Sequence, residues 1–211
     1  MACQFFDFEA WNYGDTEYFL RTSAVQMADQ HKSHTEDREN VLDVCCGRGL
    51  MIQTLKESGF KNLYGVDGSE KMLWHCELES LIPKENLFFH DFSTGDFDPN
   101  KKFNHITIHA GISFIENINK LFMNMNNILN EGGVISFNFR ERIAQDKTQE
   151  DEFGTYHEDT YVNCGYKFYL HPKNKIENII ENCGFKTIET KDYQFGTSHL
   201  IDGVLITARK K

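Results

Sequence analysis

VLDVCCGRG, residues 41–49, is the stretch of sequence that decides how the rest of the chain is interpreted. Residues 41–46 form a short apolar run, which is typical of a buried strand. Gly47 and Gly49 follow, and glycine permits both a tight turn and close approach of a ligand to the backbone. Free N–H groups at the start of the next helix would point at that ligand. The segment therefore predicts a ligand site to which the strand delivers Asp43, and the alternative is a turn that merely needs glycine.

Strand and helix patterns alternate on the carboxyl side of this segment. Strands are predicted over residues 41–46, 62–67, 86–91, 103–110, 134–139, 185–194 and 199–210, and helices before Gly59 and over residues 69–81, 118–133 and 173–185. Such alternation favours a parallel sheet with helices on both faces. The last two strands are separated only by GTS (196–198), which is too short for a parallel crossover, so they are expected to form an antiparallel hairpin.

Two more acidic residues end predicted strands. Asp67 stands in YGVDGSEKML (64–73), 18 residues beyond Gly49. A carboxylate about 20 residues after a glycine turn commonly accepts hydrogen bonds from ribose hydroxyls. Helix capping is the alternative for Asp67, but Ser69 already offers a cap. Met72, one turn into that helix, packs either on a purine face or in the core.

Asp91 ends the third predicted strand in FFHDFSTGDF (88–97), beside Phe92. A carboxylate can accept from an exocyclic amine, and the next backbone N–H can donate to a ring nitrogen. An acid in a surface loop is the alternative. Three acids at three successive strand ends, Asp43, Asp67 and Asp91, are harder to explain as unrelated surface residues.

These motifs resemble those of the class I S-adenosylmethionine-dependent methyltransferases. VLDVCCGRG resembles the glycine-rich first motif, GVDGSEKML the second, HDF the third, and NEGGVISFNF the segment leading into the fifth strand. The resemblance covers residues 41–140 and extends to the final hairpin. It implies an α/β, Rossmann-like sheet of seven strands in the order 3-2-1-4-5-7-6, with strand 7 antiparallel and helices on both faces. It also implies S-adenosyl-L-methionine as cofactor and S-adenosyl-L-homocysteine as product.

The resemblance further implies which residues contact the cofactor. They are Asp43, Cys45, Cys46 and Gly47 near the methionine moiety, Asp67 on the ribose, Gly68 and Met72 beside the adenosine, Asp91 and Phe92 around the adenine, and His109 facing the cofactor. Cys45 departs from the family, because many members have a glycine there. Arg48 is bulky for its place between two glycines and is expected to reach solvent or a carboxylate.

A dinucleotide-dependent dehydrogenase is the rival enzyme class. Its fingerprint, G-x-G-x-x-G, requires a third glycine at the position of Ile52. Without that glycine, close approach of a pyrophosphate and close helix–strand packing are both disfavoured.

Candidate substrate residues follow the fourth and fifth predicted strands. His109 is the candidate catalytic residue, since a neutral imidazole can accept a substrate proton; a histidine satisfied by the backbone is the alternative. Asn138 and Arg140 end the fifth strand, and Arg140 suits a carboxylate unless it forms a surface salt bridge. A general base is optional, because the leaving thioether is neutral and positioning supplies most of the rate effect.

The chain is expected to form a single methyltransferase domain over residues 1–211. Residues 1–40 would supply N-terminal cap helices, with residues 29–40 as a loop or frayed helix end and Tyr13, beside Trp11 and Phe19, as a wall of the substrate site. Residues 141–171, irregular in pattern, would be a lid insert over the active-site cleft. Its aromatic residues either cover the substrate or fill a satellite core: Tyr156, Tyr161, Tyr166, Phe168 and Tyr169.

Composition restricts the partners. The formal net charge of −10 disfavours nucleic acid and anionic membrane surfaces. The chain has no apolar run of the roughly 20 residues that span a bilayer, no CxxC pair and no zinc spacing among its histidines. Its acidic opening residues are not expected to be a secretory signal. A cytoplasmic protein without a metal is expected, as a monomer or weak homodimer. The sequence His109-Ala110-Gly111-Ile112 lacks the Asn-Pro-Pro-Tyr-type motif of enzymes that methylate base amines.

The predicted function is S-adenosylmethionine-dependent O- or N-methylation of a small molecule. A catalytically silent cofactor-binding partner or regulatory protein and a protein methyltransferase are the alternatives. GVDGS (65–69) and the ending HLIDGVLITARKK (199–211) also resemble the methyltransferase-like group named after the Williams–Beuren chromosomal region.

Overall fold

A computed structural model describes residues 14–79, 82–92, 94–143, 148–159, 166–194 and 201–211. Two residues expected to line the substrate site, Trp11 and Tyr13, lie outside these ranges, and so does Tyr161 in the expected lid. Phe19 and Tyr166 lie inside them, but only their backbones are described.

A seven-stranded sheet forms the centre of the molecule, in the order β3-β2-β1-β4-β5-β10-β9. Its strands are β1 (Glu39–Val44), β2 (Lys61–Asp67), β3 (Leu87–Phe89), β4 (Phe103–Ile108), β5 (Leu129–Ile143), β9 (Phe185–Gln194) and β10 (Ile201–Lys210). β1 to β5 pair in parallel, whereas β10 is antiparallel to both β5 and β9. Because β9 and β10 are the sixth and seventh strands of this sheet, the expected topology and the hairpin are both confirmed.

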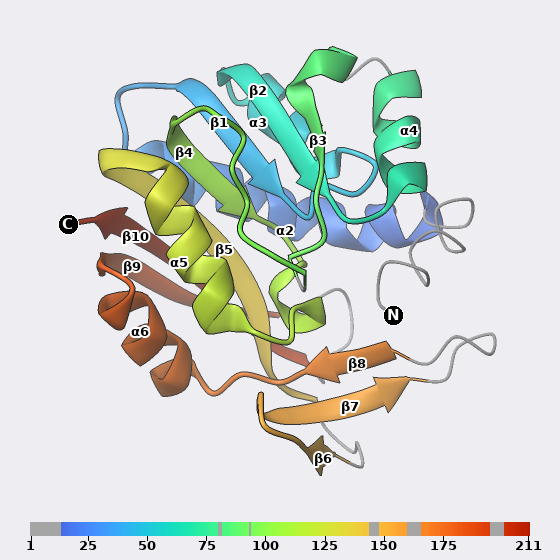
Figure 1. The fold of residues 1–211 in the computed structure, drawn as a ribbon, viewed down its shortest axis with the longest axis vertical. Helices are drawn as coiled ribbons and strands as arrows, with labels where there is room; N and C mark the ends of the chain where they lie inside the picture. Colours follow the sequence, from blue (N-terminus) through green and yellow to red (C-terminus); the bar gives the residue numbers. More distant parts are fainter. Residues whose placement is uncertain (1–13, 80–81, 93, 144–147, 160–165, 195–200) are drawn as a thin grey trace.

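Helices cover both faces of this sheet, as the alternating pattern predicts. They are α2 (Gly14–Ser33), α3 (Leu50–Glu57), α4 (Glu70–Leu78), α5 (Ile118–Ile128) and α6 (Lys173–Asn182), with the short 3₁₀ turns η1 (Lys84–Asn86) and η2 (Ile112–Phe114). The apolar sides of α5 and α6 pack in one core cluster, and those of α2, α3 and α4 in another. Figure 1 shows α5 and α6 in front of the sheet and α2 behind it.

The helix predicted over 118–133 ends earlier, at Ile128, and the prediction that Gly132 and Gly133 stop it is wrong. Both glycines lie in β5, where the pairing with β4 shifts register between Phe103 and His105. Gly132 adopts a φ of +71°, and a Cβ on Gly133 would lie 2.7 Å from the Leu129 side chain. The two glycines therefore permit an irregular pairing between β5 and β4. That pairing depends on β4, a strand from elsewhere in the chain.

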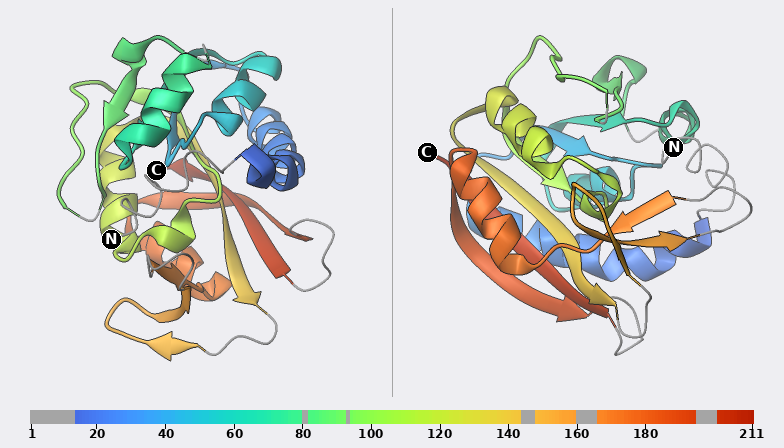
Figure 2. Two further views of the ribbon diagram at one scale, coloured as in Figure 1. Left: turned by 90° about the vertical axis from the view of Figure 1, so that its right-hand side faces the viewer. Right: turned by 60° about the horizontal axis from the view of Figure 1, so that its bottom comes forward.

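Residues 141–171 are more regular than their sequence predicts. β6 (Gln149–Glu150), β7 (Thr155–Asp159) and β8 (Tyr166–Tyr169) form a second sheet, in which β7 pairs antiparallel with both neighbours. Asp151 holds its turn together by accepting hydrogen bonds from the Phe153 N–H at 2.9 Å and the Tyr169 hydroxyl at 3.0 Å. Figures 1 and 2 show this small sheet apart from the central one, beyond the end of β5.

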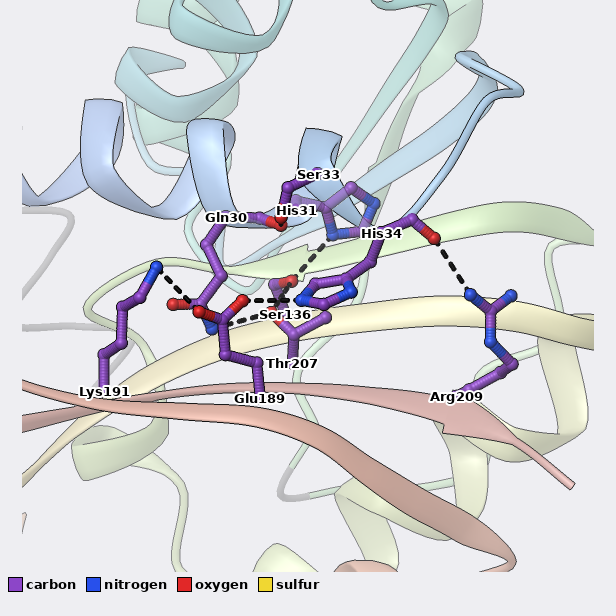
Figure 3. Close-up of polar contacts among 9 residues, drawn as sticks. All are labelled: Gln30, His31, Ser33, His34, Ser136, Glu189, Lys191, Thr207 and Arg209. Atoms are coloured by element: carbon purple, nitrogen blue, oxygen red, sulfur yellow. Dashed lines mark hydrogen bonds and ion pairs between the residues drawn. The ribbon is translucent and has the colours of Figure 1, made fainter.

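α2 is anchored to the central sheet by a buried polar network, drawn in part in Figure 3. His31 Nδ1 lies 2.8 Å from the Ser136 hydroxyl, which lies 2.8 Å from the Thr207 hydroxyl. Gln30 Nε2 donates to that Thr207 hydroxyl at 3.0 Å, and His31 Nε2 lies 3.1 Å from His105 Nδ1. The network joins α2 to β4, β5 and β10, so the helix has a defined register on the sheet. The helix itself extends to Ser33, into the stretch for which a loop was one expectation.

Candidate functional site

The turn after β1 carries the backbone geometry that its glycines predict. Gly47 and Gly49 have φ angles of +53° and +95°, and Cys45, which replaces the family's glycine, also adopts a positive φ of 56°. A Cβ added to Gly47 would meet no atom within 4 Å. The backbone of Gly47 therefore borders open space at the carboxyl end of β1. The Arg48 side chain donates to the Glu79 carboxylate at 3.1 Å, which is one of the two positions expected for it.

Asp67 connects this turn to the next helix. Its Oδ2 accepts the Gly47 N–H and its Oδ1 accepts the Ser69 N–H, both at 2.9 Å. Ser69 caps α4 as predicted, because its hydroxyl accepts the Met72 N–H at 3.2 Å. A carboxylate has about four acceptor sites, and these two N–H groups use one site on each oxygen of Asp67.

Asp43 lies buried at the end of the central strand β1. Its Oδ1 accepts the Thr107 hydroxyl at 2.8 Å. Burial raises the pKa of Asp43 to about 8, with the nearby Asp67 acting in the same direction and the Thr107 hydrogen bond opposing both. A cationic group brought close to Asp43 would favour the ionised carboxylate.

Several side chains expected to contact the cofactor are buried in the cores. Cys46 packs in the core cluster of α2 and α3, where a hydrogen bond with Cys76 and burial raise the pKa of its thiol. The Phe92 ring is 3% exposed and packs in the opposite cluster, with its centroid 5.6 Å from that of Phe97. Met72 is also buried, whereas Gly68 and Asp91 remain half-exposed.

The loop after β4 packs directly on the turn after β1. A Cβ on Gly111 would lie 2.6 Å from Cys45 Cβ and 2.9 Å from Cys45 Sγ. Asn138 Oδ1 accepts the Ala110 N–H at 2.6 Å, so the side chain expected to touch substrate also holds this loop. Two loops separated in sequence are thereby locked together at one edge of the sheet.

Gly111→Ala is expected to destabilise the fold by about 1–3 kcal/mol, because the added methyl would overlap Cys45. Cys45→Gly removes that overlap and the left-handed strain of a non-glycine residue. The double variant is therefore expected to be more stable than Gly111→Ala alone, measured by urea denaturation. Strictly additive free energies would show that the two loops do not pack as described.

His109 lies one residue beyond β4 and is almost fully buried, with 8% of its surface exposed. Its Nε2 lies 2.9 Å from the Ser23 hydroxyl of α2, a partner that no sequence motif indicates. Burial lowers the pKa of His109 to about 4, so its imidazole is neutral near neutral pH. The partner of His109 is therefore a side-chain hydroxyl, and not the backbone group that the alternative expects.

Arg140 lies where β5 approaches the small sheet. Its guanidinium carbon is 5.0 Å from the centre of the Phe168 ring, and Phe168 contacts Phe114 edge-to-face at 5.3 Å. The main chain joins the same elements, because the His171 N–H donates to the Arg140 carbonyl at 3.2 Å. The expected lid and an expected substrate residue therefore meet in space.

Within the described ranges, no helix is both long enough and apolar enough to cross a membrane. In the same part of the chain, no three histidine, cysteine or acidic side chains gather in a way that would hold a metal ion.

Comparison with known proteins identifies similar chains. A family model described as "Methyltransferase domain" matches residues 16–190. Malonyl-[acyl-carrier protein] O-methyltransferase 2 of Ilyobacter polytropus is 30% identical over 115 residues, which are 53% of this chain and 44% of that protein. The match thus spans less than half of the relative's length.

Solved structures share the fold at low identity. CalS10, an amino pentose methyltransferase from Micromonospora echinaspora solved with S-adenosylmethionine, has a TM-score of 0.68 at 16% identity, covering 91% of this chain and 92% of its own. The glycopeptide N-methyltransferase MtfA, also complexed with S-adenosylmethionine, has a TM-score of 0.68 at 16% identity, covering 89% and 94%.

Proposed function

The chain belongs to the methyltransferase domain family, matched over residues 16–190, and from this we propose that it transfers a methyl group from S-adenosyl-L-methionine to a small molecule. The acceptor atom is oxygen or nitrogen, and S-adenosyl-L-homocysteine is the second product. The observation that carries the proposal is the bridge made by Asp67, whose carboxylate accepts the N–H groups of Gly47 and Ser69. The backbone of Gly47 borders open space at this point. In open α/β sheets, ligands bind at this carboxyl edge.

We carry the cofactor contacts over from the sequence with one refinement. Asp67 would bind the ribose hydroxyls, and Asp43 and the turn of Cys45, Cys46 and Gly47 would lie near the methionine moiety. Gly68 and Met72 would lie beside the adenosine, Asp91 and Phe92 around the adenine, and His109 near the reacting centre. The refinement is that Cys46, Met72 and Phe92 would contribute backbone groups, because all three side chains are buried.

The bound cofactor would supply an electrophilic methyl group carried by a sulfonium sulfur. In-line transfer of that methyl group to the acceptor would leave the sulfur as a neutral thioether. The chain's own residues would orient the acceptor atom and exclude water. Neutral His109 accepts a hydrogen bond from the acceptor's O–H or N–H, and Asn138 fixes the loop that carries His109 through the Ala110 N–H. Arg140 beside Phe168 suits a substrate with a negative group and an apolar part.

The size of the substrate is proposed on two grounds. Two similar proteins act on an amino pentose and a glycopeptide, as their names state. The small sheet of β6 to β8 approaches η2 and Arg140, which supports a lid of residues 141–171 on a single methyltransferase domain. Tyr13 and the closer kinship to the Williams–Beuren group remain predictions.

Asp67→Ala is expected to weaken binding of S-adenosyl-L-methionine by about 1–3 kcal/mol, because ribose hydroxyls lose their acceptor and two backbone N–H groups lose theirs. Titration calorimetry on the wild type with S-adenosyl-L-methionine, S-adenosyl-L-homocysteine and NADH tests both the proposal and the residue. The sulfur compounds are expected to bind at roughly micromolar concentration, and NADH not at all.

Asp98→Ala is the matched control, since Asp98 also accepts a backbone N–H, that of Asn100 at 2.9 Å, but in an exposed loop before β4. It is expected to leave the affinity unchanged. Equal affinity of Asp67→Ala and wild type would refute the ribose contact. Absence of binding by the wild type would overturn the proposed function.

A further inference from the structure

Ser23 reaches the proposed site from a helix that the motifs of the family do not include. It lies on α2, 86 residues before His109, and is buried with 6% of its surface exposed. One face of α2 is buried around it, through Ala24 and Met27. Two turns further on, Gln30 and His31 anchor the helix in the polar network with the sheet. The position of the Ser23 hydroxyl is therefore set by packing at both ends of this stretch.

The hydrogen bonds of Ser23 decide which nitrogen of His109 carries the proton. A hydroxyl has a single hydrogen to donate. The Leu20 carbonyl, 2.8 Å from Ser23 Oγ, can only accept, so it takes that hydrogen. The contact of 2.9 Å between Ser23 Oγ and His109 Nε2 is then a bond that Nε2–H donates. In a neutral imidazole with Nε2 protonated, Nδ1 carries the lone pair.

Nδ1 is left available by these contacts. Among the residues that the structure describes, Nδ1 has no hydrogen-bond partner. Nδ1 is also not among the fully buried polar atoms that lack a partner, so it is not completely enclosed. Burial disfavours the charged imidazolium, which lowers the pKa of His109 to about 4 and keeps the ring neutral over the usual pH range. The ring is thus held with one nitrogen bound and the other open.

We infer that Ser23 is a positioning residue, which holds His109 as the Nε2–H tautomer so that Nδ1 accepts the O–H or N–H of the methyl acceptor. This inference rests on the proposed function. When the acceptor atom forms its bond to the methyl carbon, the S–C bond breaks and its electron pair stays on sulfur. The acceptor's proton passes to Nδ1 and then from the imidazolium to water, so that no further reactant is needed.

The tautomer is measured directly by ¹⁵N NMR of the histidine-labelled protein, with the His109 signals assigned by their loss in His109→Gln. The wild type is expected to show a protonated Nε2 and an unprotonated Nδ1 at His109, without any ligand. Ser23→Ala is expected to give a mixture of tautomers, and Ser23→Thr, which keeps the hydroxyl, to restore the wild-type signals. A wild-type His109 protonated at Nδ1 would overturn the inference.

Ser33→Ala is the matched control, because Ser33 makes the same kind of hydroxyl bond on α2, to the Gln30 carbonyl at 2.8 Å, and has no hydrogen bond to a histidine side chain among the described residues. It is expected to leave the His109 signals unchanged. If Ser23→Ala fails to fold by thermal denaturation, the wild-type spectrum and Ser23→Thr still decide the tautomer.

The role in catalysis is tested separately, with an acceptor found by screening against labelled cofactor. Ser23→Ala is expected to lower kcat roughly ten-fold or more with an unchanged Kd for S-adenosyl-L-methionine, and Ser23→Thr to recover most of it. Unchanged kcat in Ser23→Ala would refute the positioning role. If the wild type binds no S-adenosyl-L-methionine, the proposed function fails, whereas the NMR result for Ser23 and His109 stands by itself.

Discussion

Gly47→Val is expected to abolish binding of S-adenosyl-L-methionine while the chain still folds. Gly47 has a φ of +53°, and a Cβ there meets nothing within 4 Å in the described part of the chain, so the first carbon of the new side chain meets open space. Left-handed backbone at a non-glycine residue costs roughly 1–2 kcal/mol, which a domain of ordinary stability tolerates. The valine would instead fill the space beside the Asp67 carboxylate, where the cofactor is proposed to lie.

The control for this substitution is Gly132→Val. Gly132 has a similar φ of +71°, also has nothing within 4 Å of an added Cβ, and lies near the start of β5, at the opposite edge of the sheet. Thermal unfolding is expected to report a similar loss of stability for both variants. Calorimetry is expected to show a loss of more than about 100-fold in affinity for Gly47→Val alone. Retained binding by Gly47→Val would contradict the assignment of the turn.

Lowering the pH from 7 to 5 is expected to destabilise the protein by several kcal/mol. Four buried histidines contribute most clearly: burial lowers the pKa of His105, His109 and His171 to about 4, and that of His31 well below its usual 6.5. Between these values and 6.5 the unfolded chain binds protons that the folded chain does not, so stability falls as the pH falls through this window. Each of the three histidines whose pKa falls to about 4 contributes about 2 kcal/mol at pH 5, and His31 acts in the same direction.

The titration of Asp43 changes the folding stability in the opposite direction. Because burial raises its pKa from 3.8 to about 8, the folded chain holds a proton that the unfolded chain releases, and this favours folding at lower pH. One carboxyl opposes four imidazoles, and the contact between His31 and His105 couples two of those, so the net loss remains but is smaller than the sum.

Urea denaturation at a series of pH values measures this dependence. His105→Gln, which keeps a hydrogen-bonding side chain but does not titrate, is expected to flatten the slope by about 1.4 kcal/mol per pH unit within the window. A stability that stays constant from pH 7 to pH 5 would contradict the burial of neutral histidines at these positions.

Local features of the chain were sufficient to predict the strands, the helices and the final hairpin, and the local geometry of two turns, whereas the strand order was implied by the family resemblance. The period of the apolar residues distinguishes strands from helices, and the short connection at residues 196–198 permits only an antiparallel hairpin. The turn at Gly47, the cap at Ser69 and the acids at the ends of β1 and β2 depend on neighbours close in sequence, so their residue types indicate their geometry. Cys45 is the exception, because its positive φ is imposed on a residue that disfavours it.

Tertiary structure alone decided the features that join distant segments. The pair Gly132 and Gly133 indicates a helix stop by itself, but serves a strand irregularity once β4 lies alongside. The three strands of residues 149–169 carry too weak a pattern to be predicted and form through pairing with one another.

The partner of His109 could not be predicted from the chain either, because Ser23 lies 86 residues away on a helix whose register is set by the buried contacts of Gln30 and His31. Sequence by itself determined the strands, the final hairpin and the acids at the strand ends, since these follow from periodicity and short connections, whereas the order of the strands was implied by the resemblance to the methyltransferase family. Packing between distant elements decided which side chains there are buried, which tautomer His109 adopts and which groups remain open to a ligand, since a contact between distant segments leaves no trace in local residue patterns.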